Sequence, residues 1–238
     1  LVACRSLWYY PNFSLSFDKS LLFRRFCSGL GFFSILALLM PLLRAYASHF
    51  DKGAISILNF AHKLFELPMA IIVAAITTVM LPRLSGYIND IEHDKATAIL
   101  GYAMRLLIIA LLAISCSTVF YSENIARIVF FGAKFTDQQF SILGWLFTIG
   151  ILGLPFQGLI TFYGIAFISY DRTKPLIVVS IFMVFSILII CRYLSIINGL
   201  SDLMILYVLT HFLGAFFLSY SLFQTTGRRP FLIAFKNP

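Results

Sequence analysis

Long apolar runs separated by short polar connections dominate the chain. Each of the six runs is long enough, or nearly so, to supply the roughly 20 residues that a helix needs to cross the hydrocarbon core of a bilayer. The pattern therefore predicts an all-α fold, a polytopic membrane helix bundle with about six transmembrane helices. We expect the spans at residues 31–48, 54–81, 98–120, 140–168, 176–193 and 203–223, which together form one membrane lobe.

Two stretches outside these spans lie at the ends of the chain. Residues 1–30 mix bulky apolar side chains with Arg24 and Arg25, a composition typical of an amphipathic helix on the membrane surface. We expect them to form a cytoplasmic connection. Residues 224–238 are polar and basic, and we expect them to begin another cytoplasmic connection that leads to further spans.

Composition supports a membrane protein and excludes a water-soluble domain. Of the 238 residues, 60% are hydrophobic and only 12% are charged, and the mean hydropathy is +0.92. A soluble domain carries about 25% charged residues. The sequence contains no phosphate-binding glycine loop, no nucleophile elbow and no metal-ligand spacing. We therefore expect no enzyme, no cofactor and no metal site.

The net charge of +8 is divided unevenly between the two sides of a six-span chain. One side carries only Lys52, Arg127, Lys134 and Arg192. The other side carries Lys19, Arg24, Arg25, Arg83, Lys95, Arg172, Lys174, Arg228, Arg229 and Lys236. The more basic side of a membrane protein faces the cytoplasm. The positive charge is thus explained by orientation in the membrane, and we expect no nucleic-acid partner.

Polar side chains inside the second span form the candidate site. Ser56, Asn59, Lys63 and Glu66 are three, four and three residues apart, so they share one face of a helix. A charge in the bilayer core is costly and normally faces protein or a water-filled cavity. Two interpretations stay open. The face lines a hydrated substrate cavity, or Lys63 and Glu66 form an internal ion pair that holds helices together.

Two further residues belong to the same region. Arg44 lies about one turn from the end of the first span, where it can either line a cavity or extend to the membrane interface. Pro68 follows the polar face directly and removes one backbone hydrogen bond from the helix. We expect Pro68 to act as a hinge, and breaks of this kind often lie beside binding sites in transporters.

The second span also carries a recognisable motif. It contains Gly53-Ala54-Ile55-Ser56, then Ala61-His62-Lys63-Leu64-Phe65-Glu66-Leu67-Pro68, and ends with Leu81-Pro82-Arg83-Leu84-Ser85. This closely resembles the MurJ (MviN) lipid II flippase family, whose pattern is roughly GSxSxxxYAxRLxxxPxG followed by LLPxLS. Four further stretches agree with family motifs, and the resemblance covers nearly the whole chain. They are Pro11-Asn12-Phe13, Arg44 with Ala47-Ser48, Lys134-Phe135-Thr136, and Ala166-Phe167 with Asp171 and Pro175.

The resemblance implies a fold and a function. The family belongs to the MOP superfamily and has a MATE-like fold, with two lobes around a central cationic cavity. This chain is similar to the second lobe, and its partner would be the missing N-terminal lobe of the same transporter. The implied activity is the flipping of lipid II, a lipid-linked anionic peptidoglycan precursor, across the bacterial cytoplasmic (inner) membrane by alternating access. The other implied partners are membrane lipids.

The resemblance also implies roles for individual residues. Lys63 takes the place of the family's cavity arginine, and Arg44 matches the arginine of the family's seventh span. Both are expected to contact the pyrophosphate of the substrate. Ser56 and Glu66 stand at matching polar positions, and Asn59 lies on the same face. These three are expected to add polar contacts, with Glu66 also holding Lys63 or taking part in ion coupling.

The chain departs from the family pattern at three positions. Lysine at position 63 keeps the charge of arginine but lacks its planar fork for bidentate phosphate contact. Leu43 stands where the family usually has an aspartate, and the family's lysine of the tenth span falls near Ile160 or Thr161. Two alternative functions therefore stay open. One is an exporter of another lipid-linked polysaccharide, and the other is a non-transporting membrane remnant or assembly subunit.

Overall fold

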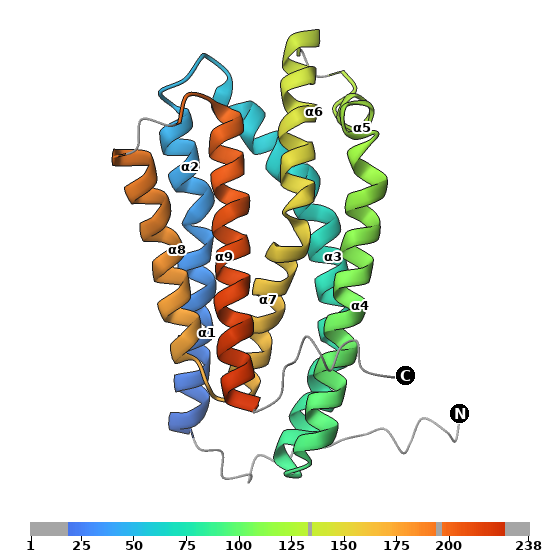
Figure 1. The fold of residues 1–238 in the computed structure, drawn as a ribbon, viewed down its shortest axis with the longest axis vertical. Coiled ribbons are helices and arrows are strands. Elements are labelled where there is room, and N and C mark those ends of the chain that lie inside the picture. The colour runs from blue at the N-terminus through green and yellow to red at the C-terminus, as the bar shows by residue number, and fades with distance from the viewer. Residues whose placement is uncertain (1–18, 133–134, 194–196, 227–238) are drawn as a thin grey trace, which may run out of the picture.

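The computed structural model describes residues 19–132, 135–193 and 197–226 (Figure 1). Every regular element in these ranges is an α-helix. In chain order they are α1 (Lys19–Ala37), α2 (Leu39–Ala47), α3 (Ala54–Asn89), α4 (His93–Val119), α5 (Ser122–Val129), α6 (Asp137–Leu152), α7 (Leu154–Ser169), α8 (Lys174–Tyr193) and α9 (Leu200–Thr226).

The predicted all-α membrane bundle is confirmed. Five helical segments are long and apolar enough to cross a bilayer, and the bent pair α6–α7 makes a sixth if it counts as one span. The helices α1 and α2 together form the first of these segments, Phe23–Ala47, and are separated only by a turn at Leu38. The segment lengths follow from the bilayer thickness, because each turn of helix crosses about 5.4 Å.

The first span begins earlier than the sequence predicts. Residues 19–30 do not form a separate helix but are the first part of α1. The difference has a physical reason, because Arg24 and Arg25 both contact the carboxylate of Asp171 and so can stay on the spanning helix. The rest of the predicted N-terminal connection, residues 1–18, and most of the predicted C-terminal one, residues 227–238, lie outside the described residues.

The two ends of the bundle correspond to the two predicted sides of the membrane. Figure 1 shows the start of α1, the α3–α4 turn, the α7–α8 turn and the end of α9 at its lower end. The α2–α3 connection, the end of α8, the start of α9 and α5 lie at the upper end. The lower end is therefore the one whose connections carry most of the basic residues, and the sequence predicts that it faces the cytoplasm.

The long helix α3 packs against most of the bundle. It contacts α2, α4, α6 and α7, and its fully buried side chains include Leu58, Phe65 and Leu84. Two prolines lie within it, Pro68 and Pro82, and the helix is continuous through both. The predicted hinge at Pro68 is therefore not a break in this conformation, and it remains a prediction for the transport cycle.

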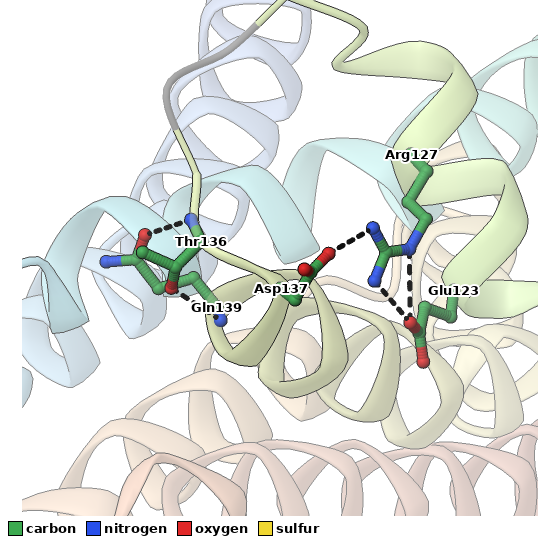
Figure 2. A network of polar contacts seen from close by, with 5 residues as sticks. All are labelled: Glu123, Arg127, Thr136, Asp137 and Gln139. Atoms are coloured by element: carbon green, nitrogen blue, oxygen red, sulfur yellow. Dashed lines mark hydrogen bonds and ion pairs between the residues drawn. The ribbon is translucent and has the colours of Figure 1, made fainter.

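Polar contacts fix the start of α6 against α5 at the upper end (Figure 2). The guanidinium of Arg127 donates to Asp137 Oδ1 at 2.8 Å and to Glu123 Oε1 at 3.0 Å. The hydrogen bond to Asp137 raises the pKa of the Arg127 guanidinium most, and the hydrogen bond to Glu123 raises it further. The hydroxyl of Thr136 caps α6 by accepting from the backbone N–H of Gln139, and the Gln139 side chain accepts from the Thr136 N–H in return.

The span formed by α6 and α7 is broken at Gly153, with a bend of 47°. Pro155 lies in the first turn of α7 and has no N–H to donate to the carbonyl of Ile151, four residues earlier. The hydroxyl of Ser115 on α4 donates to this carbonyl at 2.7 Å and also lies 2.8 Å from the carbonyl of Leu111. A neighbouring helix thus adds a second donor to this oxygen, which also accepts from a backbone N–H at the C-terminal cap of α6.

Replacing Ser115 by alanine tests this contact. The variant Ser115→Ala removes a hydrogen bond between two helices, which lowers the free energy of unfolding by about 0.5–1.5 kcal/mol. We expect a lower melting temperature for the native polypeptide that carries this chain, measured by thermal unfolding in detergent. The matched control is Ser117→Ala, because the exposed Ser117 hydroxyl bonds only to Ile114 within its own helix. Equal melting temperatures for the two variants would contradict the assigned role.

Candidate functional site

A cavity of about 400 Å³ lies where α3 meets α1, α2, α7 and α9. Its polar lining comes from α2, α3, α7 and α9, and its apolar lining comes mainly from α1 and the start of α2. The polar lining residues are Arg44, His62, Lys63, Glu66, Gln157, Thr161, Tyr207 and His211. The apolar ones are Phe33, Leu36, Ala37, Met40, Pro41, Met69 and Ile160. We call this the central cavity.

The structure brings together three of the predicted site residues. Arg44, Lys63 and Glu66 all line the central cavity, although Arg44 comes from a different helix. Ser56 and Asn59 share the same face of α3 but do not line the cavity. Ser56 precedes Lys63 by seven residues, which is about 10 Å along the helix axis. The predicted roles of Ser56 and Asn59 therefore remain predictions.

The proposed ion pair between Lys63 and Glu66 is not present among the described residues. Instead, Oε2 of Glu66 lies 3.4 Å from Nδ1 of His62, one turn earlier on α3. Lys63 is exposed to the cavity and has no ion-pair partner in the described part of the chain. Its ammonium group is thus available to a ligand, which favours the hydrated cavity over the helix-bridging pair.

Two buried donors in the cavity wall have no hydrogen-bond partner within the described residues. They are Nε of Arg44 and Nε2 of Gln157, whose side chain is only 3% exposed. A buried donor without an acceptor costs about 1–3 kcal/mol. Water or a ligand with acceptor oxygens would recover this cost. Together with Lys63, these groups give the cavity donors on three helices, α2, α3 and α7.

An aromatic layer lies behind these polar groups. The rings of His62 and Phe65 are 5.0 Å apart, and those of Tyr207 and His211 are 4.2 Å apart. Nδ1 of His211 lies 2.8 Å from the carbonyl oxygen of Tyr207. Since a carbonyl only accepts, Nδ1 is the donor, and in the neutral ring Nε2 is left as an acceptor. This contact fixes the histidine ring on the cavity wall.

Sequence reasoning missed five polar residues of the cavity: His62, Gln157, Thr161, Tyr207 and His211. His62 stands beside Lys63 in the sequence, and each of the others is a polar or amphipathic side chain in an apolar span. Their only sign in the sequence was a polar side chain inside a span, where burying a polar group in the bilayer costs free energy. The structure also places Ile160 and Thr161 in the lining, so the cavity has no cation where the family usually has a lysine.

Comparison with known proteins agrees with these observations. The probable lipid II flippase MurJ of Rhizobium meliloti (strain 1021) is 25% identical over 123 residues, which cover 52% of this chain and 23% of that protein. The corresponding protein of Helicobacter pylori (strain J99 / ATCC 700824) is 25% identical over 140 residues, or 58% of this chain and 30% of that protein. The chain thus spans less than a third of the length of these curated relatives.

A solved structure has the same fold. It is described as lipid II flippase MurJ in an inward closed conformation, and it matches with a TM-score of 0.68 at 18% sequence identity. The match covers 84% of this chain and 43% of that one. This likeness establishes the fold: a membrane helix bundle whose helices are arranged as in part of that structure.

The family model described as "Lipid II flippase MurJ" matches residues 16–234. These residues make up most of the chain and include all of the described helices. The apolar helices and these relatives make the chain a multi-pass protein of the bacterial inner membrane. The chain belongs to the lipid II flippase MurJ family.

Proposed function

We propose that this chain forms one lobe of a transporter that moves lipid II across the inner membrane, and that the central cavity is part of the substrate path. One observation carries the proposal. Within the described part of the chain, Nε of Arg44 and Nε2 of Gln157 are buried donors without a hydrogen-bond partner, and they line a cavity that also holds Lys63, which has no ion-pair partner there. Membership of the MurJ family supplies the substrate class.

The chemistry of the substrate fits these groups. A pyrophosphate has only acceptor oxygens and carries negative charge, so it cannot cross hydrocarbon without replacing its hydration. Hydrogen bonds from a guanidinium or ammonium group to such oxygens are shorter and about twice as strong as neutral ones. In this proposal Arg44 and Lys63 contact the pyrophosphate and Gln157 donates beside them, while the lipid tail stays in the bilayer.

The remaining predicted site residues have separate roles in this proposal. The Glu66 carboxylate repels the pyrophosphate from its own side, and its contact with His62 keeps it away from Lys63. Glu66 is also the group best placed to take part in ion coupling. Ser56 and Asn59, further along the same face of α3, add polar contacts as the headgroup moves. Pro68 permits α3 to bend during this movement.

Alternating access requires a second cavity wall. In this proposal it is supplied by an N-terminal lobe of the same transporter, and rocking of the two lobes exposes the cavity first to the cytoplasm and then to the outside. The central cavity lies among five helices of a single lobe, so its donors stay together while the lobes move.

Neutralising Lys63 tests the proposal. Losing one charge-assisted hydrogen bond of about 1.5–3 kcal/mol lowers transport by about 10-fold to 100-fold. We expect Lys63→Gln in the native polypeptide to lose support of growth in cells depleted of their own flippase, and Lys63→Arg to keep it. Lys95→Gln is the control, because Lys95 is exposed, lies outside the cavity and pairs with Glu92. Normal growth with Lys63→Gln at an equal membrane level would refute the assignment and favour a non-transporting remnant.

Gln157 permits a test that separates function from stability. The variant Gln157→Leu removes a buried amide with no hydrogen-bond partner on Nε2, so we expect unchanged or higher thermal stability, by up to about 1 kcal/mol, together with weaker transport. The matched control, Gln139→Leu, breaks the cap of α6 and should lower stability by about 1 kcal/mol. Thermal unfolding and lipid II transport in proteoliposomes measure the two effects. A destabilised Gln157→Leu with normal transport would show that the amide is structural.

A further inference from the structure

A second polar cavity lies at the lower end of the bundle (Figure 1). It has a volume of about 590 Å³ and is bordered by the start of α1, the α7–α8 turn and the end of α9. None of its lining residues belongs to the central cavity. Its charged lining residues are Arg24, Arg172, Lys174 and Asp171, and we call it the lower cationic cavity.

Cations outnumber carboxylates in the lower cationic cavity. Nη2 of Arg24 forms an ion pair with Oδ2 of Asp171, and Nε of Arg25 lies 3.5 Å from Oδ1 of the same carboxylate. One acidic side chain therefore serves two arginines. Arg172 and Lys174 are exposed and have no ion-pair partner among the residues that the structure describes. The described side chains thus leave an excess of positive charge that an anion would neutralise.

The backbone holds these cations in a tight turn. The N–H of Asp171 donates to the carbonyl of Ile168 at 3.1 Å, and the N–H of Arg172 donates to Phe167 at 2.9 Å, which closes α7. Asp171 adopts a left-handed conformation with φ of 54°, which aspartate tolerates better than most residues. The α8 helix begins directly afterwards at Lys174, so its positive end adds to the field at the same place.

The depth of this cavity in the membrane follows from its neighbours. Phe23 and Phe26, on either side of the arginines of α1, are 70% and 65% exposed, and Val178 near the start of α8 is 66% exposed. Large apolar side chains with this exposure face acyl chains when a helix is in a bilayer. The cations beside them therefore lie at the level of the lipid headgroups, on the side predicted to be cytoplasmic.

We propose that the lower cationic cavity binds the phosphate group of an anionic phospholipid in the cytoplasmic leaflet. Guanidinium and ammonium groups match the acceptor oxygens of a phosphodiester, and Gln224 at the end of α9 lines the same cavity. Basic pockets between membrane helices on the cytoplasmic side generally bind the headgroups of anionic lipids. A free phosphate has the same chemistry, but the exposed apolar side chains beside the cavity favour a ligand with acyl chains. The site does not depend on the proposed transport of lipid II.

Lipid titration tests this site. The native polypeptide that carries this chain is purified in detergent, titrated with phosphatidylglycerol or with phosphatidylcholine, and followed by native mass spectrometry. We expect one phosphatidylglycerol molecule to bind more tightly than phosphatidylcholine does. The double variant Arg172→Gln with Lys174→Gln should weaken this binding by at least about 10-fold, since each basic residue near a membrane surface contributes on the order of 1 kcal/mol.

The control removes the same charge from the same end of the molecule. Arg83→Gln with Lys95→Gln changes two exposed cations that do not line the cavity, and it should leave the affinity unchanged. All four side chains are exposed, so both double variants should keep the wild-type melting temperature. Equal losses in the two variants, or no loss in the first, would overturn the site. Displacement of the lipid by inorganic phosphate at an equal concentration would overturn the lipid as its ligand.

Discussion

Within a bilayer no water is available to satisfy a free backbone carbonyl, so a proline in a spanning segment obliges the protein to find another donor. Pro155 withholds its helical hydrogen bond from the carbonyl of Ile151, which accepts instead from a backbone N–H at the C-terminal cap of α6 and from the hydroxyl of Ser115 on α4. The bend of 47° between α6 and α7 thus leaves no unpaired oxygen at Ile151. Because α7 packs against α3, α4 and α9 after this bend, Gln157 in its first turns reaches the wall of the central cavity.

Close packing on α3 supports the same wall. A side chain at Gly150 of α6 would place its Cβ only 2.3 Å from the ring of Phe65, so glycine permits this approach of the two helices. Phe65 in turn packs against His62 and lies 6.2 Å from the ring of Tyr207. The polar groups of the cavity therefore stand on a rigid aromatic layer. Such a layer limits the rotation of the donor side chains and so keeps them facing a ligand. In a loosely packed wall, these side chains could turn toward one another.

The sequence predicts the spans and three of the eight polar residues that line the central cavity, for identifiable reasons. Bilayer thickness sets the span lengths, and helical spacing places Lys63 and Glu66 on one face. The same spacing cannot tell where along the axis a cavity ends, and for this reason Ser56 and Asn59 lie outside it. No sequence pattern pointed to His211 or Gln157, because these residues of α9 and α7 meet Lys63 of α3 only in the folded bundle. The early start of α1 depends on Asp171, which is distant in sequence and near only in the fold.

The balance of charge separates polar groups that hold the fold together from those that face a ligand. At the upper end two carboxylates, Glu123 and Asp137, share the single guanidinium of Arg127 (Figure 2). Each charged side chain of this network has an oppositely charged partner within it. In the central cavity the one carboxylate contacts a histidine instead of the cations, and in the lower cationic cavity one carboxylate serves more cations than it can neutralise. Holding like charges together in this way costs free energy, and an anionic ligand offsets that cost. The same physical argument therefore supports both proposals of a phosphate-bearing ligand. In these proposals the lower cationic cavity holds a resident lipid at the headgroup level, and the central cavity holds the substrate in transit.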